Sequence, residues 1–184
     1  MLPIMIAAPH HLVSVAEYHR MIDAGVFAPG ERIELLDGEL IAMAPMGNRH
    51  FTAITALNRQ FVQAMPPHLT IGCQVPVVLG DQDEPEPDVM IFHDRPGKPV
   101  ASDVLAVVEV ADTTLAFDRQ EKRPRYARAG IPECWIVDLT EDRIEVASDP
   151  GPDGYRQLVV VRPGEPLRIP GSHVALAWDQ VFRR

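Results

Sequence analysis

The sequence predicts an α/β fold in which helices flank a mixed central β-sheet and a β-hairpin lies near the N-terminus. The hairpin signal is two apolar segments joined by Asp37-Gly38. A strand-helix-strand passage from 104 to 138 then predicts a right-handed crossover between strands of one sheet. Short apolar, β-branched segments between turn-forming residues supply the neighbouring strands, at 70–79, 88–92 and 104–110.

Length and composition favour one globular domain spanning 1–184. With 184 residues, 46% of them hydrophobic and 23% charged, the chain can bury a core of two or three layers. Its apolar runs fall short of the roughly 20 residues that span a bilayer. The start, Met1 to Ile6, lacks the basic stretch of a signal peptide. We therefore expect a cytoplasmic protein without a membrane contact, in which Cys73 and Cys134 are reduced.

The first half of the chain carries two helix signals on either side of the hairpin. Ser14 and Glu17 have capping-box spacing and Gly25 follows the last turn, which predicts a helix over 14–24. Apolar residues at helical intervals predict a second helix over 48–64, ending before two prolines. Between them, the predicted hairpin strands are 32–36 and 39–43.

The second half contains the crossover helix and the last strands. The stretch 116–129 is polar and basic, is terminated by Gly130, and places Asp118, Lys122 and Tyr126 on one helical face. Pro124 predicts either a kink or a regular helix that begins near Arg123. The remaining strands are expected at 134–138, 143–148 and 155–161.

Two carboxylates stand at the ends of adjacent apolar strands. Asp88 precedes one strand and Glu109 lies near the end of the next. Burying an unpaired carboxylate costs several kcal/mol, so these acids need a compensating cation, either a basic side chain or a divalent metal. Asp88 could instead cap a turn, and Glu109 could pair with an arginine. We pursue the metal, because Mg²⁺ and Mn²⁺ favour carboxylate and carbonyl oxygens.

A third ligand and a lysine would complete such a metal site. The carbonyl of Val110, next to Glu109, is the expected third ligand. A divalent ion held there would activate water and stabilise charge on a phosphoryl group. Lys98 and Lys122 are the chain's lysines, and Lys122 lies in the helix that follows Glu109. Alternatively, Lys122 is solvent-exposed and pairs with Asp118, an ion pair that would stabilise the helix by a few tenths of a kcal/mol.

Overall charge argues against a nucleic-acid partner, whereas its local distribution does not. The formal net charge is −9, which repels phosphates at long range. Basic residues gather directly after Glu109, between 119 and 128. Arg119 and Arg123 are therefore candidates for steering a phosphate backbone.

Taken together, these motifs resemble those of the Uma-type putative restriction endonuclease family, which belongs to the PD-(D/E)xK nuclease superfamily. The resemblance covers roughly 10–180 and extends upstream to the hairpin and His50. Its motifs are Pro87-Asp88, Glu109-Val110, Asp112-Thr113-Thr114, Asp118, Lys122, Tyr126, Gly130-Ile131-Pro132-Glu133 and Trp135-Ile136-Val137-Asp138. It implies a restriction-endonuclease-like fold, a divalent metal on Asp88 and Glu109, and hydrolysis of DNA phosphodiester bonds.

One position departs from the superfamily pattern. A lysine would stand two residues after Glu109, where this chain has Ala111. The resemblance to the Uma-type family implies that the lysine has moved to the next helix, which fits Lys122. By analogy with the superfamily, in which double-strand cutting requires two sites, we also expect a homodimer.

Two further positions are candidates for the same site. Glu34 and Glu39 flank the Asp-Gly turn, and we favour Glu39 as an additional carboxylate, although strand alternation cannot choose between them. His50, at the start of a helix, is a candidate for substrate contact or proton transfer, and a structural role is its alternative.

Two other functional classes remain open. One is a catalytically silent domain that keeps the fold and acts through protein contacts, which net charge −9 and Ala111 favour. The other is a metal-dependent phosphoesterase on small substrates, which would tolerate an acidic surface better than duplex DNA would.

Overall fold

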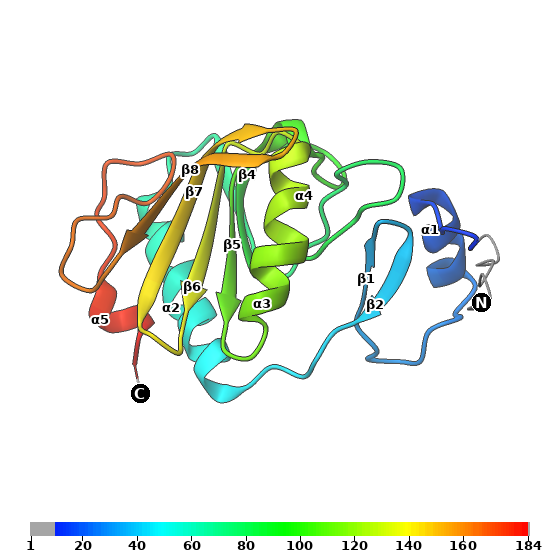
Figure 1. The fold of residues 1–184 in the computed structure, drawn as a ribbon, viewed down its shortest axis with the longest axis horizontal. Helices are drawn as coiled ribbons and strands as arrows, with labels where there is room; N and C mark the ends of the chain where they lie inside the picture. The colour runs from blue at the N-terminus through cyan, green and yellow to red at the C-terminus, as the bar shows by residue number, and fades with distance from the viewer. Residues whose placement is uncertain (1–9, 184) are drawn as a thin grey trace, which may run out of the picture.

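A six-stranded mixed sheet forms the centre of the molecule in a computed structural model that describes residues 10–183 (Figure 1). Its strand order is β3-β4-β5-β6-β7-β8, with β5 and β6 parallel and the other neighbours antiparallel. The strands are β3 (Leu69–Gly72), β4 (Val89–His93), β5 (Val104–Ala111), β6 (Glu133–Asp138), β7 (Arg143–Gly151) and β8 (Gly154–Val161). The expected mixed α/β fold is thus confirmed.

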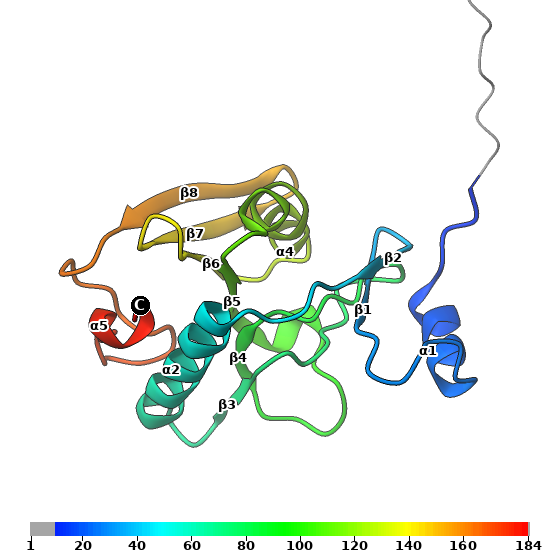
Figure 2. The same ribbon diagram turned by 90° about the horizontal axis from the view of Figure 1, so that it is seen from below.

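Helices cover both faces of this sheet. The long helix α2 (Asn48–Ala64) and the short α5 (Trp178–Val181) lie on one face, and α4 (Arg123–Arg128) lies on the other (Figure 2). Leu57 and Phe61 of α2 pack on Val108 and Trp135 in one core cluster. A second cluster on the α4 side joins Met90, Val107 and Cys134 of the other sheet face to Tyr126 of α4 and to Ile131. Side chains at alternate positions of β4 and β5 therefore serve opposite layers.

The N-terminal hairpin stands beside the sheet rather than within it. Strands β1 (Ile33–Leu36) and β2 (Glu39–Ala42) pair around Asp37-Gly38, as expected, and pack against α1 (Val15–Asp23) in a small core of their own. The predicted Ser14–Glu17 capping box begins α1. Figures 1 and 2 both place this unit on the α4 side of the molecule, where it closes one wall of a cavity described below.

Two expected elements differ from those observed. The strand predicted over 70–79 ends at Gly72, because Gln74 adopts a left-handed φ of 53° and donates its N–H to the carbonyls of Pro87 and Asp88. The helix predicted over 116–129 is divided into α3 (Leu115–Phe117), a π-helical turn η2 (Asp118–Lys122) and α4. Its regular part begins at Arg123 with Pro124 in the first turn, which is one of the two predicted solutions.

Pro124 accounts for the wide turn before it. Proline has no N–H to donate to the carbonyl four residues earlier, and its ring crowds that carbonyl. The chain widens by one residue, so that the Arg123 N–H reaches the carbonyl of Asp118. Such π-turns are frequent at functional sites because they displace side chains from regular helical positions.

The sequence predicted neither a membrane-spanning segment nor a signal peptide. Within residues 10–183 every helix is too short or too polar to cross a membrane. The expectation based on Met1 to Ile6 falls outside the described residues.

Asp138 offers a test of the loop that ends β6. It is fully buried and accepts hydrogen bonds from the Thr140 N–H and hydroxyl, the Glu141 N–H and the Arg143 guanidinium. Burial alone would raise the pKa of Asp138, but these hydrogen bonds lower it. A lowered folded pKa means that the stabilisation is complete above the unfolded value of about 3.9 and disappears as pH falls through the folded value.

We therefore expect Asp138→Asn to lower the free energy of unfolding at pH 7 by about 1–3 kcal/mol. The difference from wild type should shrink below about pH 4. Urea unfolding at several pH values measures this, and an equal difference at neutral and acidic pH would contradict the role given to the carboxylate.

Candidate functional site

A cavity of about 400 Å³ lies between the hairpin, the adjacent ends of β4 and β5, the start of α2 and the α3–η2 segment. Its acidic lining residues are Glu34, Asp88, Glu109, Asp112 and Asp118. Lys122 and His50 also line it. The sequence-predicted candidates Asp88, Glu109, Lys122, Val110 and His50 thus meet in one cavity.

Strand register brings the two predicted metal ligands together. Val89 of β4 pairs with Val108 of the antiparallel β5, so Asp88 and Glu109 are the next residues along each strand and point to the same face. The buried Asp88 Oδ2 accepts a hydrogen bond from the Val110 N–H at 2.9 Å and contacts His50 Nε2 at 2.9 Å. The backbone beside Glu109 therefore orients the other carboxylate.

Glu109 is buried within the cluster, with 2% of its surface exposed. Its Oε1 accepts a hydrogen bond from the Tyr126 hydroxyl at 2.5 Å and lies 3.3 Å from Lys122 Nζ. Burial raises the pKa of Glu109 well above its ordinary value, Lys122 lowers it, and the charges of Asp88, Asp118 and Glu34 raise it. One ammonium group is therefore not enough to offset the burial of this carboxylate.

Lys122 joins the hairpin to the sheet. Its Nζ lies 2.8 Å from Glu34 Oε1 of β1, besides its contact with Glu109, and the side chain is 5% exposed. Burial lowers the pKa of Lys122, but Glu109 and Glu34 raise it above its ordinary value. Lys122 is therefore a fixed cation at neutral pH and cannot accept a proton as a general base.

Asp118 and His50, which also line the cavity, have shifted pKa values as well. Burial raises the pKa of Asp118 to about 6, against the opposing effects of the Thr114 hydrogen bond and Lys122. Burial lowers the pKa of His50, but its hydrogen bond to Asp88 and the charge of Asp88 together raise it. The interactions with Asp88 are thus the main cause of the raised pKa of His50, whereas burial is the main cause of the raised pKa of Asp118.

The donor set fits a magnesium-type ion. Four buried carboxylates, Glu34, Asp88, Glu109 and Asp118, line the cavity. The Lys122 ammonium pairs with Glu34 and Glu109, and His50 contacts Asp88, so the buried acids outnumber the basic groups that pair with them. Among residues 10–183, no three His, Cys, Asp or Glu side chains converge closely enough to hold an ion by themselves. Mg²⁺ suits such a site, because it is usually bound through one or two carboxylates and keeps several waters.

Glu39 is not part of this cluster, which corrects our choice between the two hairpin acids. Glu34 pairs with Ile41, and both line the cavity. Glu39 pairs with Leu36, two residues nearer the turn, and is exposed. A shift of two residues moves a side chain by roughly 7 Å along a strand, so Glu39 is on the same face but beyond the cavity.

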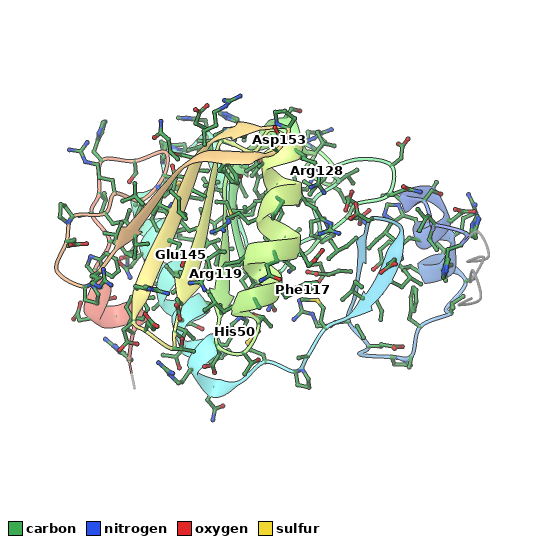
Figure 3. The ribbon with its side chains drawn as sticks, in the orientation of Figure 1. His50, Phe117, Arg119, Arg128, Glu145 and Asp153 are labelled. Atoms are coloured by element: carbon green, nitrogen blue, oxygen red, sulfur yellow. The ribbon has the colours of Figure 1, made fainter. Side chains whose placement is uncertain are left out.

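Arg119 and Arg123 also lie away from the cavity, contrary to their predicted role in binding substrate. Both guanidinium groups contact the buried Glu145 of β7, and Arg119 also lies 3.6 Å from Asp138. Figure 3 shows Arg119 and Glu145 on the β6–β7 side of the helical segment, whereas Phe117 lies on the hairpin side. These arginines hold the crossover helix to the sheet.

Tyr126 is the residue whose role the sequence left out. Its ring is fully buried, and its hydroxyl donates a hydrogen bond to Glu109. The signal was present in the spacing: Lys122 and Tyr126 are four residues apart, and both reach Glu109. A buried tyrosine commonly pairs its hydroxyl with a polar group.

Removal of the shared ammonium should destabilise the protein. Lys122→Met leaves Glu34 and Glu109 buried without their cation, which costs about 3–5 kcal/mol. In the Lys122→Met background, Glu109→Gln should recover part of that loss because it removes an uncompensated charge. Urea unfolding at pH 7 in EDTA measures both variants. A loss below about 1 kcal/mol in Lys122→Met would place this lysine among weak surface pairs.

Comparisons with known proteins identify the family and the fold of the chain. Residues 15–178 match the model of the Uma2 family, described as "putative restriction endonuclease". No curated protein matches the chain. The chain is similar in structure to a putative nuclease of DUF820 from Anabaena variabilis ATCC 29413, with a TM-score of 0.71 and 14% identity, over 92% of this chain and 97% of that one. At this identity the likeness shows a shared fold. Since the family model spans most of the chain, this protein belongs to the Uma2 family.

Proposed function

We propose that this protein is a Mg²⁺- or Mn²⁺-dependent endonuclease of PD-(D/E)xK type that hydrolyses DNA phosphodiester bonds. The observation that carries the proposal is that Asp88, Glu109, Asp118 and Glu34 line one cavity, in which the Lys122 ammonium pairs with Glu34 and Glu109. Buried carboxylates without a cation are costly, and active sites are where such arrangements are retained. Membership of the Uma2 family supports a nuclease in particular.

Asp88, Glu109 and the carbonyl of Val110 would hold the ion. When bound, a divalent cation lowers the pKa of a coordinated water and neutralises charge on the phosphoryl oxygens. Asp88 is prepared for this role because the Val110 N–H and His50 fix its orientation. Tyr126 fixes Glu109 in the same way, through its contact with Oε1. Preorganised ligands of this kind lose little entropy on binding.

Lys122 supplies a positive charge that does not titrate at neutral pH. Its ammonium lies 3.3 Å from Glu109 and lines the cavity that substrate would enter. We propose that it stabilises the charge that develops on the attacked phosphate. His50 contacts Asp88 and therefore acts as a positioning residue for that carboxylate. Cleavage of both DNA strands would further require two such sites, as in a homodimer.

A metal-dependent phosphoesterase on small substrates is the second candidate. It is favoured by the engagement of the cavity's basic residues: among the described lining residues, Arg32 pairs with Glu86 and Lys122 with Glu34 and Glu109. Duplex binding draws most of its affinity from Lys and Arg contacts to phosphates. The catalytically silent alternative predicts neither metal binding nor turnover.

Metal binding should depend on both predicted ligands. Calorimetric titration of the wild type with Mn²⁺ is expected to show a site that Asp88→Asn and Glu109→Gln each weaken by roughly tenfold or more, since each variant removes one of two charged ligands. Glu39→Gln is the matched control, because this exposed acid lies on the hairpin beside the cavity but does not line the cavity. Equal Mn²⁺ binding in all four proteins would contradict the proposed metal site.

Cleavage should require the same residues and Lys122. With Mg²⁺ or Mn²⁺ at low salt, the wild type and Glu39→Gln are expected to nick supercoiled plasmid. Asp88→Asn should lose the activity, and Lys122→Met should lower the rate by about 10²-fold or more, the usual effect of removing one transition-state contact. Full activity in Lys122→Met would show that another group stabilises the phosphate. Hydrolysis of a small phosphodiester without plasmid nicking would favour the second candidate.

A further inference from the structure

The cavity has two chemically different walls. The buried acidic side chains form its floor, whereas β2, the segment after it and the end of α3 contribute a more exposed apolar wall. This wall consists of Ile41, Met43, Pro45, Met46 and Phe117. Ile41, Met43 and Phe117 are partly buried, and Met46 is 38% exposed. A metal site alone does not require such a wall, because water and phosphate make no use of apolar surface.

The apolar wall adjoins the proposed phosphate site directly. Phe117 immediately precedes Asp118, the first residue of the π-turn that carries Lys122. Ile41 lies opposite Glu34 in the hairpin register. Figure 3 shows Phe117 on the side of α3 that faces the hairpin. One ligand could therefore contact the acidic floor and the apolar wall at the same time.

The chemistry of the cavity fits one class of ligand. A nucleotide combines an anionic phosphate with a flat, apolar-faced base. At about 400 Å³ the cavity falls within the range of small-molecule pockets, roughly 300–1,000 Å³. Bases stack favourably on aromatic side chains and do so without sequence preference. The acidic floor would bind the phosphate through a metal, and the apolar wall would contact the base.

A base inside an intact duplex could not reach this wall. Its faces are covered by the neighbouring base pairs, so it would have to leave the stack at a cost of a few kcal/mol. The described basic lining residues, Arg32 and Lys122, are both paired with carboxylates and offer little to the backbone of a duplex. An unpaired strand exposes its base faces without that cost.

We propose that the apolar wall is a base subsite, in which Phe117 and Met46 receive an unpaired nucleobase next to the phosphate held at Asp88 and Glu109. The preferred substrate is then single-stranded or locally unpaired DNA. This inference rests on the proposed nuclease function, which it deepens by naming the substrate class. It assigns Phe117 to substrate recognition and separates it from Phe51, which is 60% exposed and does not line the cavity.

A double-mutant cycle between protein and DNA tests the subsite. Short single strands labelled with a fluorophore are bound in Ca²⁺, with gels to verify that they stay intact, either unmodified or with one abasic position scanned along the strand. The proteins are wild type, Phe117→Ala, Met46→Ala and the matched control Phe51→Ala. Met46→Ala guards against misfolding, because its side chain is the more exposed one.

We expect one abasic position to weaken binding to the wild type and to Phe51→Ala by about tenfold, the effect of losing one stacked base. Phe117→Ala should weaken binding of the intact strand by a similar factor and then show no further loss with the abasic strand. Met46→Ala should weaken it by a smaller factor. The blunt duplex of the same sequence should bind the wild type at least tenfold more weakly than the single strand does.

Equal binding of intact and abasic strands by the wild type would overturn the subsite, as would equal losses in Phe117→Ala and Phe51→Ala. If metal-dependent nicking still requires Asp88, the nuclease proposal stands while the base subsite fails. If the coupling between Phe117 and the base is present but no metal-dependent cleavage occurs, the subsite stands and the nuclease proposal fails.

Discussion

The site depends on the ion pairs that the Lys122 ammonium makes with two buried glutamates. The ammonium lies between Glu34 of the hairpin and Glu109 of the central sheet, two elements whose apolar residues pack in separate hydrophobic clusters. Without it, the hairpin would present a buried acid to other buried acids, and charge repulsion would open the cavity. The same contact helps to hold the hairpin beside the sheet.

The geometry around Lys122 follows from a single proline. Pro124 prevents a regular helix across 116–129, and the resulting π-turn carries Asp118 and Lys122 to buried positions facing the acids. Directly after it, α4 aims Tyr126 at Glu109. A regular helix would have rotated these side chains relative to one another. The wide turn therefore links a local backbone constraint to the electrostatics of the site.

Sequence reasoning succeeded where local signals are strong. The capping box at Ser14, the Asp-Gly hairpin and the apolar period of 48–64 each predicted an element at its observed place. Two short apolar strands in succession predicted that Asp88 and Glu109 are neighbours, and their strands do pair in the sheet. These features depend on a few residues close together in the chain, so tertiary packing does not override them.

It failed where the outcome depends on long-range partners. Strand alternation could not separate Glu34 from Glu39, and we favoured Glu39. The hairpin position that lies against Lys122 is instead Glu34, 88 residues away from that lysine in the chain. Arg119 and Arg123 looked available for phosphate because Glu145 had no visible connection to them. The strand predicted to reach 79 is broken at Gln74, whose left-handed backbone is stabilised by carbonyls from the next segment.

We propose that a divalent cation binds the buried acids near Lys122. A crystal grown with Mn²⁺ and measured for anomalous scattering would show where the cation binds. We expect one strong peak within coordination distance, about 2.0–2.3 Å, of both the Asp88 and the Glu109 carboxylates, next to the Val110 carbonyl. A fully occupied Mn²⁺ elsewhere with no peak at these carboxylates, or a Lys122 ammonium seated between them, would contradict this proposal.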